Sequence, residues 1–169
     1  MHETPADLDA LQALLDRSYE GAGAHYREVT TPERRLDAAQ VAERLVGMCL
    51  LVVASVTADG RPIGGPLDGI FFRGSFHFGT SPESVRLRHL RQRPWVTATH
   101  LPSEEFSVTV HGRAAPVDTK QELDFRQTLL DIYVPRYGPE WEKFLDSGPQ
   151  FTRIEADRMF TFFMPEGSG

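Results

Sequence analysis

Two tight-turn signals in the middle of the chain constrain its fold more than any other feature. Residues 50–57 are apolar and β-branched and stop at Asp59-Gly60, and residues 61–72 stop at Arg73-Gly74, just before residues 75–79. Asp-Gly is a strong signal for a hairpin between antiparallel strands. The sequence therefore predicts three consecutive antiparallel strands joined by short turns.

Three more strands are predicted downstream. Residues 95–101 stop at Pro102, residues 106–117 alternate apolar and polar side chains, and residues 151–164 form the last strand. A single short helix between these strands does not suit a doubly wound parallel sheet. The order of elements favours a mainly β, α+β fold, an antiparallel barrel with helices packed outside it.

Four helices are predicted from their start signals. In three of them Ser or Thr precedes Pro, at Thr4, Thr31 and Ser81, where the hydroxyl can cap free N–H groups and proline fills the first helical position. The fourth is expected to begin near Thr119, with a capping box, and to end by Pro135.

The length of 169 residues suits one domain with a core of its own. We expect residues 1–47 to form N-terminal helices, 48–118 the barrel core, 119–148 further helices and 149–164 a closing strand, all in a single domain over residues 1–169. The Gly-Ser-Gly end is expected to be disordered.

Charge and cysteine content limit which partners and which cellular location are expected. A net charge of −6 disfavours nucleic acid or an anionic membrane as the main partner, and no apolar run is long enough to cross a bilayer. The acidic N-terminus is unlike a signal peptide, and a lone cysteine cannot form an internal disulfide, so a cytoplasmic location is expected. Cys49, in an apolar run, is predicted to be a buried, unreactive thiol.

One basic stretch stands out in this acidic chain. It holds four arginines: Arg86, Arg88, Arg91 and Arg93. Such a concentration points to a small anionic ligand.

The residues just before these arginines predict a phosphate cradle, in which a strand ends, the chain turns and a helix begins. The helix start offers free N–H groups and a favourable dipole, Thr80, Ser81 and Ser84 offer hydroxyls, and Arg86 offers a guanidinium. A plainer interpretation stays open. Ser-Pro-Glu is a common helix cap, and arginines on a short helix usually form a solvated face.

An ordered set of motifs between Leu51 and Ala115 resembles the flavin-binding core of the pyridoxamine 5'-phosphate oxidase-like family. The motifs are Asp59-Gly60-Arg61-Pro62, Pro66-Leu67, Thr80-Ser81-Pro82-Glu83-Ser84-Val85-Arg86 and His111-Gly112-Arg113-Ala114. The resemblance implies a split β-barrel of the FMN-binding type. The flanking helices and closing strand look like those of an actinobacterial branch, whose members use FMN or the deazaflavin F-420.

The resemblance also implies where a cofactor would bind. Thr80, Ser84 and Arg86 would hold its phosphate, and Pro66, Leu67 and Asp68 would lie along its ring system. Family members are usually homodimers with the cofactor at the subunit interface, and Ser107 matches a position that reaches the cofactor from the partner chain.

The chain departs from the true vitamin B6 oxidases. Ile63 and Gly64 stand where those enzymes carry a phosphate-binding arginine, and Val85 replaces one basic residue of a common pair. We therefore expect an oxidoreductase that transfers hydride between FMN, or F-420, and an unknown small substrate other than pyridoxine phosphate. No catalytic side chain is assigned.

The alternative is a non-catalytic flavin or haem carrier. His77 and His111 are the possible iron ligands, although a lone strand histidine is more often structural. No Cys/His spacing indicates a zinc site, and no metal is predicted.

Overall fold

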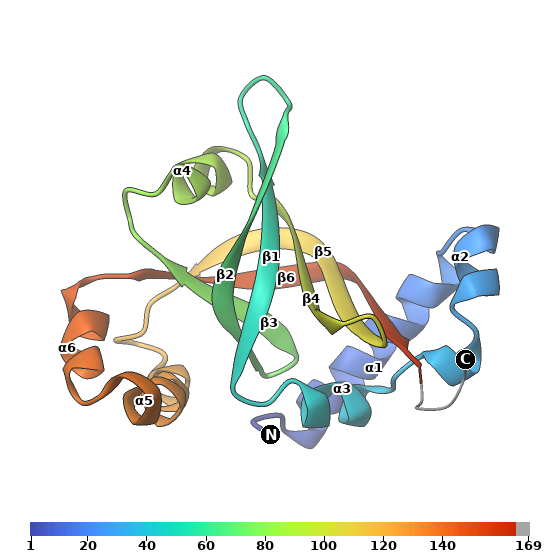
Figure 1. Ribbon diagram of the computed structural model, residues 1–169, viewed down its shortest axis with the longest axis horizontal. Coiled ribbons are helices and arrows are strands. Elements are labelled where there is room, and N and C mark those ends of the chain that lie inside the picture. The colour runs from blue at the N-terminus through green and yellow to red at the C-terminus, as the bar shows by residue number, and fades with distance from the viewer. Residues whose placement is uncertain (165–169) are drawn as a thin grey trace.

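The computed structural model describes residues 1–164, so the Gly-Ser-Gly end lies outside the described residues. Within them, six strands close into a barrel in the order β1-β2-β3-β6-β5-β4 (Figure 1). The strands are β1 (Met48–Val56), β2 (Pro62–Phe72), β3 (Ser75–Thr80), β4 (Trp95–Ser103), β5 (Phe106–Val117) and β6 (Gln150–Phe163). Every pairing is antiparallel, which confirms the predicted α+β barrel.

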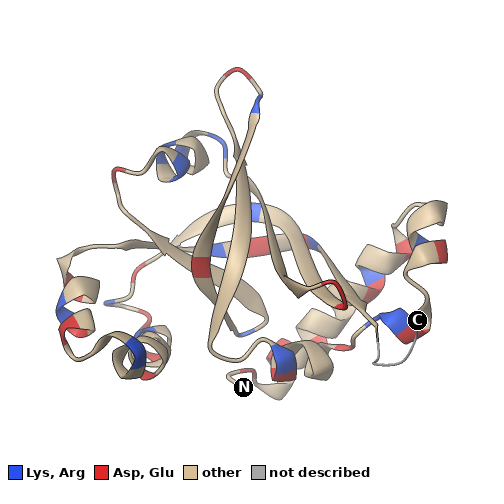
Figure 2. Ribbon diagram, viewed as in Figure 1, with Lys and Arg blue, Asp and Glu red and all other residues tan. Residues whose placement is uncertain are grey.

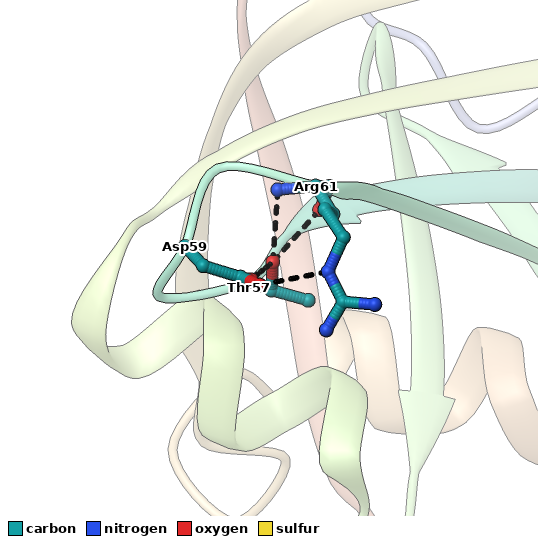
Figure 3. Close-up of polar contacts among 3 residues, drawn as sticks. All are labelled: Thr57, Asp59 and Arg61. Carbon is teal, nitrogen blue, oxygen red and sulfur yellow. Dashed lines mark hydrogen bonds and ion pairs between the residues drawn. The ribbon is translucent and has the colours of Figure 1, made fainter.

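The β1–β2 turn shows why the Asp-Gly signal was informative (Figure 3). Gly60 has a φ of 84°, a conformation that favours glycine. The Thr57 hydroxyl accepts a hydrogen bond from the Arg61 backbone N–H at 2.9 Å and donates to the Asp59 carboxylate, which also accepts from Arg61 Nε at 2.8 Å. The two strands are thereby held in register at the hairpin tip.

Alternation along the strands sends one set of side chains into the barrel. Leu51, Val53, Phe76 and Phe78 are among those with almost no exposed surface. Cys49 belongs to the same core, is 2% exposed, and has a pKa raised to about 11 by burial. Its predicted burial is confirmed.

Two groups of helices cover parts of the barrel's outside. One group, α1 (Pro5–Glu20), α2 (Ala24–Val29), the 3-10 turn η1 (Pro32–Arg34) and α3 (Ala38–Arg44), lies at the C-terminal end of β6; α2 was not predicted. The other group, α5 (Leu123–Tyr137) and α6 (Glu140–Ser147), builds a second apolar core over Ile70, Phe72 and Phe151. No helix of the described residues is long and apolar enough to span a membrane.

Part of the barrel's outside remains without such cover. The outward side chains Leu50 and Val52 of β1 and Trp95 and Leu101 of β4 are between 54% and 64% exposed. We call these four residues and the strand surface around them the open face. It lies toward the viewer in Figure 1, where β1 crosses in front of the barrel.

The Ser/Thr-Pro signals were right once and wrong twice about where a helix begins. Thr4 caps α1 as predicted, but Thr31 opens only η1, and α3 starts after Asp37. Ser81 likewise opens a turn, and α4 (Val85–Gln92) starts after Ser84. In each failure the chain makes one tight turn, and a later side chain then captures a helical N–H group instead.

Three other predicted boundaries also move. α5 begins at Leu123 with Glu122 in the N-cap position, and it continues past Pro135 to Tyr137. A proline so near the C-terminal end removes only one helical hydrogen bond, and the Gly138 N–H closes the helix on the Val134 carbonyl at 2.8 Å. β4 passes through Pro102 because Ser103 still pairs with Phe106.

Candidate functional site

The junction between β3 and α4 presents a set of unused hydrogen-bond donors. The Ser84 hydroxyl oxygen accepts from the Leu87 N–H at 3.1 Å and from the Thr80 hydroxyl at 3.0 Å. Both of its acceptor positions are filled, so the Ser84 hydrogen is left to donate to another group. The backbone N–H groups of Val85 and Arg86 make no hydrogen bond within residues 1–164. Together these groups can receive an oxyanion.

Arg86 connects this junction to β2. Its Nη2 donates to the Gly65 carbonyl at 3.2 Å, which uses one of five N–H donors and leaves the others available. Partial burial lowers the pKa of the guanidinium from its usual value, as expected for a cation drawn out of water. A Cβ atom at Gly65 would lie 3.1 Å from the same Nη2. Because glycine has no side chain, the Arg86 guanidinium can lie this close to β2. Arginines colour much of α4 blue in Figure 2.

The three predicted β2 residues do not point the same way. Pro66 and Asp68 face outward and are exposed, whereas the Leu67 side chain packs against the barrel core. Leu67 can therefore offer a ligand only its backbone. Asp68 accepts a 2.8 Å hydrogen bond from the Tyr133 hydroxyl of α5. Burial, and then Asp68, raise the pKa of Tyr133, which keeps that hydroxyl protonated.

A cavity of about 330 Å³ adjoins the junction. Asp68, Thr80 and Ser81 line one part of it, and aromatic residues of α5 and α6 line another. Tyr133 stacks on Trp141 with 4.6 Å between ring centroids and 9° between planes. A polar edge beside flat apolar walls suits a planar ligand with an anionic tail.

Sequence reasoning missed Tyr133 at this site. It lies 65 residues from Asp68, and no local pattern connects the two. Trp141 and Phe144 of α6 also line the cavity, and Trp141 packs against the second apolar core as well.

Ser107 does not join the other site residues within one chain. It faces outward on β5, paired with Phe162 of β6, and β1 and β4 separate β5 from β2 around the barrel. The structure thus brings Thr80, Ser81, Ser84 and Arg86 together beside β2 and leaves Ser107 elsewhere.

The two strand histidines lie apart, on β3 and β5. His77 is buried, and burial lowers its pKa to about 4. His111 Nδ1 lies 2.9 Å from the Thr97 hydroxyl, and partial burial lowers its pKa too. No group of three or more His, Cys, Asp or Glu side chains within residues 1–164 could hold a metal ion.

A closed antiparallel six-stranded barrel with helices packed outside it defines a split-barrel protein, as predicted. The model of the pyridoxamine 5'-phosphate oxidase family matches residues 38–160. The chain belongs to this family, as its motifs predicted. No curated protein matched the sequence significantly.

Solved structures share the fold at low sequence identity. A conserved hypothetical protein from Mycobacterium tuberculosis is 18% identical with a TM-score of 0.66, over 82% of this chain and 95% of its own. A FAD-binding protein from Mesorhizobium loti is 20% identical with a TM-score of 0.57, over 78% and 98%. The haem storage protein HutZ from Vibrio cholerae is 20% identical with a TM-score of 0.55, over 67% and 85%. At these identities the likeness concerns the fold alone.

Proposed function

We propose that this protein binds FMN at the β3–α4 junction and acts as a flavin-dependent oxidoreductase on a small substrate. The observation that carries the proposal is the set of free donors at this junction: the Ser84 hydroxyl, the Val85 and Arg86 amides, and the Arg86 guanidinium. These groups fit a phosphate monoester in number and charge.

In this proposal each residue has a limited task. The junction holds the phosphate, the exposed surface at Pro66 and Asp68 supports the ring system, and Tyr133 fixes the Asp68 carboxylate. A bound flavin would supply the hydride chemistry, and no side chain of the site needs to act as acid or base. The aromatic cavity beside the junction would exclude water from a planar substrate.

FMN is preferred over the deazaflavin F-420 because FMN is the commoner cofactor in this family, and the phosphate cradle would suit both. Arg88 and Arg91 are exposed on α4 and would be available to the longer anionic tail of F-420. Pyridoxine phosphate is not proposed as substrate, because Ile63 and Gly64 replace the expected arginine.

A homodimer is part of the proposal, and the open face supports it. Four large apolar side chains exposed together on adjacent strands are unusual for a surface that stays in water. Ser107 lies on the outward side of β5 next to Val108, which pairs with His100, one residue from Leu101. A second copy on the open face would therefore bring its Ser107 toward the first copy's site.

Val52→Arg should break this dimer. The substitution would place a charge without a partner inside an apolar interface, at a cost of several kcal/mol. We expect the variant to be a monomer in size-exclusion chromatography with light scattering. Val29→Arg, which replaces an exposed apolar residue of α2 outside the open face, should leave the dimer intact. A monomeric wild type, or a dimeric Val52→Arg, would contradict the proposed interface.

The function is tested by spectroscopy of the purified protein. We expect saturable binding when FMN is added, measured by quenching of flavin fluorescence, and reoxidation of bound reduced FMN by an artificial acceptor. Tight binding without any turnover would favour the second candidate, a flavin carrier. Binding of haem in place of FMN would overturn the assignment.

A further inference from the structure

A second cavity, of about 560 Å³, lies where the β2–β3 hairpin, β6 and the start of α5 meet. It shares no lining residue with the cavity beside the β3–α4 junction. The residues that matter for its chemistry are Arg73, His77, Glu122, Asp124, Phe125 and Arg153. No part of the proposed flavin site depends on them.

His77 lines this cavity and carries a free hydrogen-bond acceptor. The side chain is 2% exposed and packs against the Phe125 ring with 4.5 Å between centroids. Its Nδ1 lies 3.1 Å from the Ser75 carbonyl, which can only accept, so Nδ1 carries the proton. Because burial keeps the ring neutral, Nε2 holds a free lone pair, and it makes no hydrogen bond within the described part of the chain.

The first turn of α5 presents donors to the same cavity. Glu122 occupies the N-cap position, but its side chain caps nothing, and the Asp124 and Phe125 N–H groups make no hydrogen bond within residues 1–164. α5 has 15 residues, so its dipole favours negative charge at this end. A helix start left uncapped beside a buried unpartnered histidine is suited to a ligand.

Two arginines and three carboxylates set the charge around the cavity. Arg73 pairs closely with Asp124, at 2.6 Å. Arg153 makes only long contacts, 4.0 Å to Glu122 and 3.4 Å to Glu155, and keeps most of its donor capacity. The acidic side chains are thus turned toward arginines, and Arg153 can still bind an anion.

We propose that this cavity is a second ligand site, for a small oxyanion that also carries an O–H group, such as a hydrogen phosphate or a 2-hydroxycarboxylate. The anionic oxygens would accept from the Asp124 and Phe125 amides and from Arg153. The ligand O–H would donate to His77 Nε2. In an oxyanion without a hydrogen, an oxygen lone pair would face the Nε2 lone pair, and the repulsion between them would weaken binding.

Titration with matched anions, followed by amide NMR shifts, tests the site. Phosphate keeps a proton at neutral pH and sulfate does not, and glycolate has the hydroxyl that acetate lacks. We expect the Asp124 and Phe125 amides to shift with phosphate or glycolate at concentrations about tenfold lower than with sulfate or acetate, the effect of one hydrogen bond to a charged group. Comparison of phosphate with glycolate identifies which ligand class the site prefers.

Two variants test the roles of His77 and Arg153 in this site. His77→Phe should remove the preference for phosphate over sulfate. Arg153→Gln, at a partly exposed position, should weaken the binding of both anions and preserve the ratio of their affinities. This variant still tests the site if His77→Phe does not fold. Arg86→Ala should change neither result, so failure here is separate from failure at the flavin site. Equal shifts from phosphate and sulfate, or no shift at Asp124 and Phe125, would overturn the proposal.

Discussion

Arg86→Ala should weaken FMN binding about 10- to 100-fold. The guanidinium is a fully charged donor at the β3–α4 junction, and a hydrogen bond to a charged group contributes about 1.5–3 kcal/mol. The substitution also frees the Gly65 carbonyl that Arg86 now holds at 3.2 Å. Fluorescence titration with FMN measures the loss, and Arg86→Lys should recover part of it by restoring the charge without the planar fork.

Arg88→Ala is the matched control, because Arg88 lies on the same helix and is exposed. It should leave FMN affinity unchanged. The same variant separates the two cofactors, since a loss of affinity for F-420 alone would show that the longer tail reaches along α4. If Arg86→Ala binds FMN as tightly as wild type, the cradle assignment is wrong.

Gly112→Ala should be the most destabilising single-methyl addition in the barrel. A Cβ atom there would lie 2.1 Å from the Glu155 carbonyl oxygen and 2.9 Å from the Ala156 Cα, so the β6 backbone itself would have to move. Crowding of a packed interior costs about 1–3 kcal/mol, and here the neighbour is backbone, so we expect about 3 kcal/mol. For a domain of this size the melting temperature should fall by about 10 °C.

Gly64→Ala provides the comparison in the same barrel. Its added Cβ would meet only the Ala54 Cβ, at an ordinary 4.0 Å. The free energy of unfolding should change by no more than about 0.5 kcal/mol, as for most surface substitutions. Thermal melts of both variants by circular dichroism decide the matter, and equal melting temperatures would show that β6 yields more easily than the geometry indicates.

Gly112 shows that a motif can be recognised in a sequence although the physical reason for its glycine is not visible there. In the sequence, Gly112 belongs to the motif His111-Gly112-Arg113-Ala114. The structure adds the cause, a register shift between β5 and β6 that begins between His111 and Gly112 and brings the two backbones together. Such a shift depends on the partner strand, which the local sequence does not describe.

The helix starts also separate what the local sequence predicts from what the structure decides. Ser-Pro and Thr-Pro predicted helix starts at Thr4, Thr31 and Ser81. Thr4 does begin an α-helix, but at Thr31 and Ser81 the chain makes one tight turn. Whether the turn continued as a helix was decided by competing caps, such as Asp37 with Gln40 and Ser84 with Leu87. Each cap stabilises its helix by about 1 kcal/mol, too little for a sequence pattern to rank.

By itself the sequence determined the strands, the hairpins and the hydroxyls and arginine of the β3–α4 junction, because each depends on neighbours a few residues apart. The antiparallel barrel was predicted from the order of these elements. Only the tertiary structure decided which side chains meet. It placed Tyr133 on Asp68, turned Leu67 inward and set His77 against the start of α5. Those contacts join segments far apart in the chain, and closure of the barrel, rather than any local preference, brings them together.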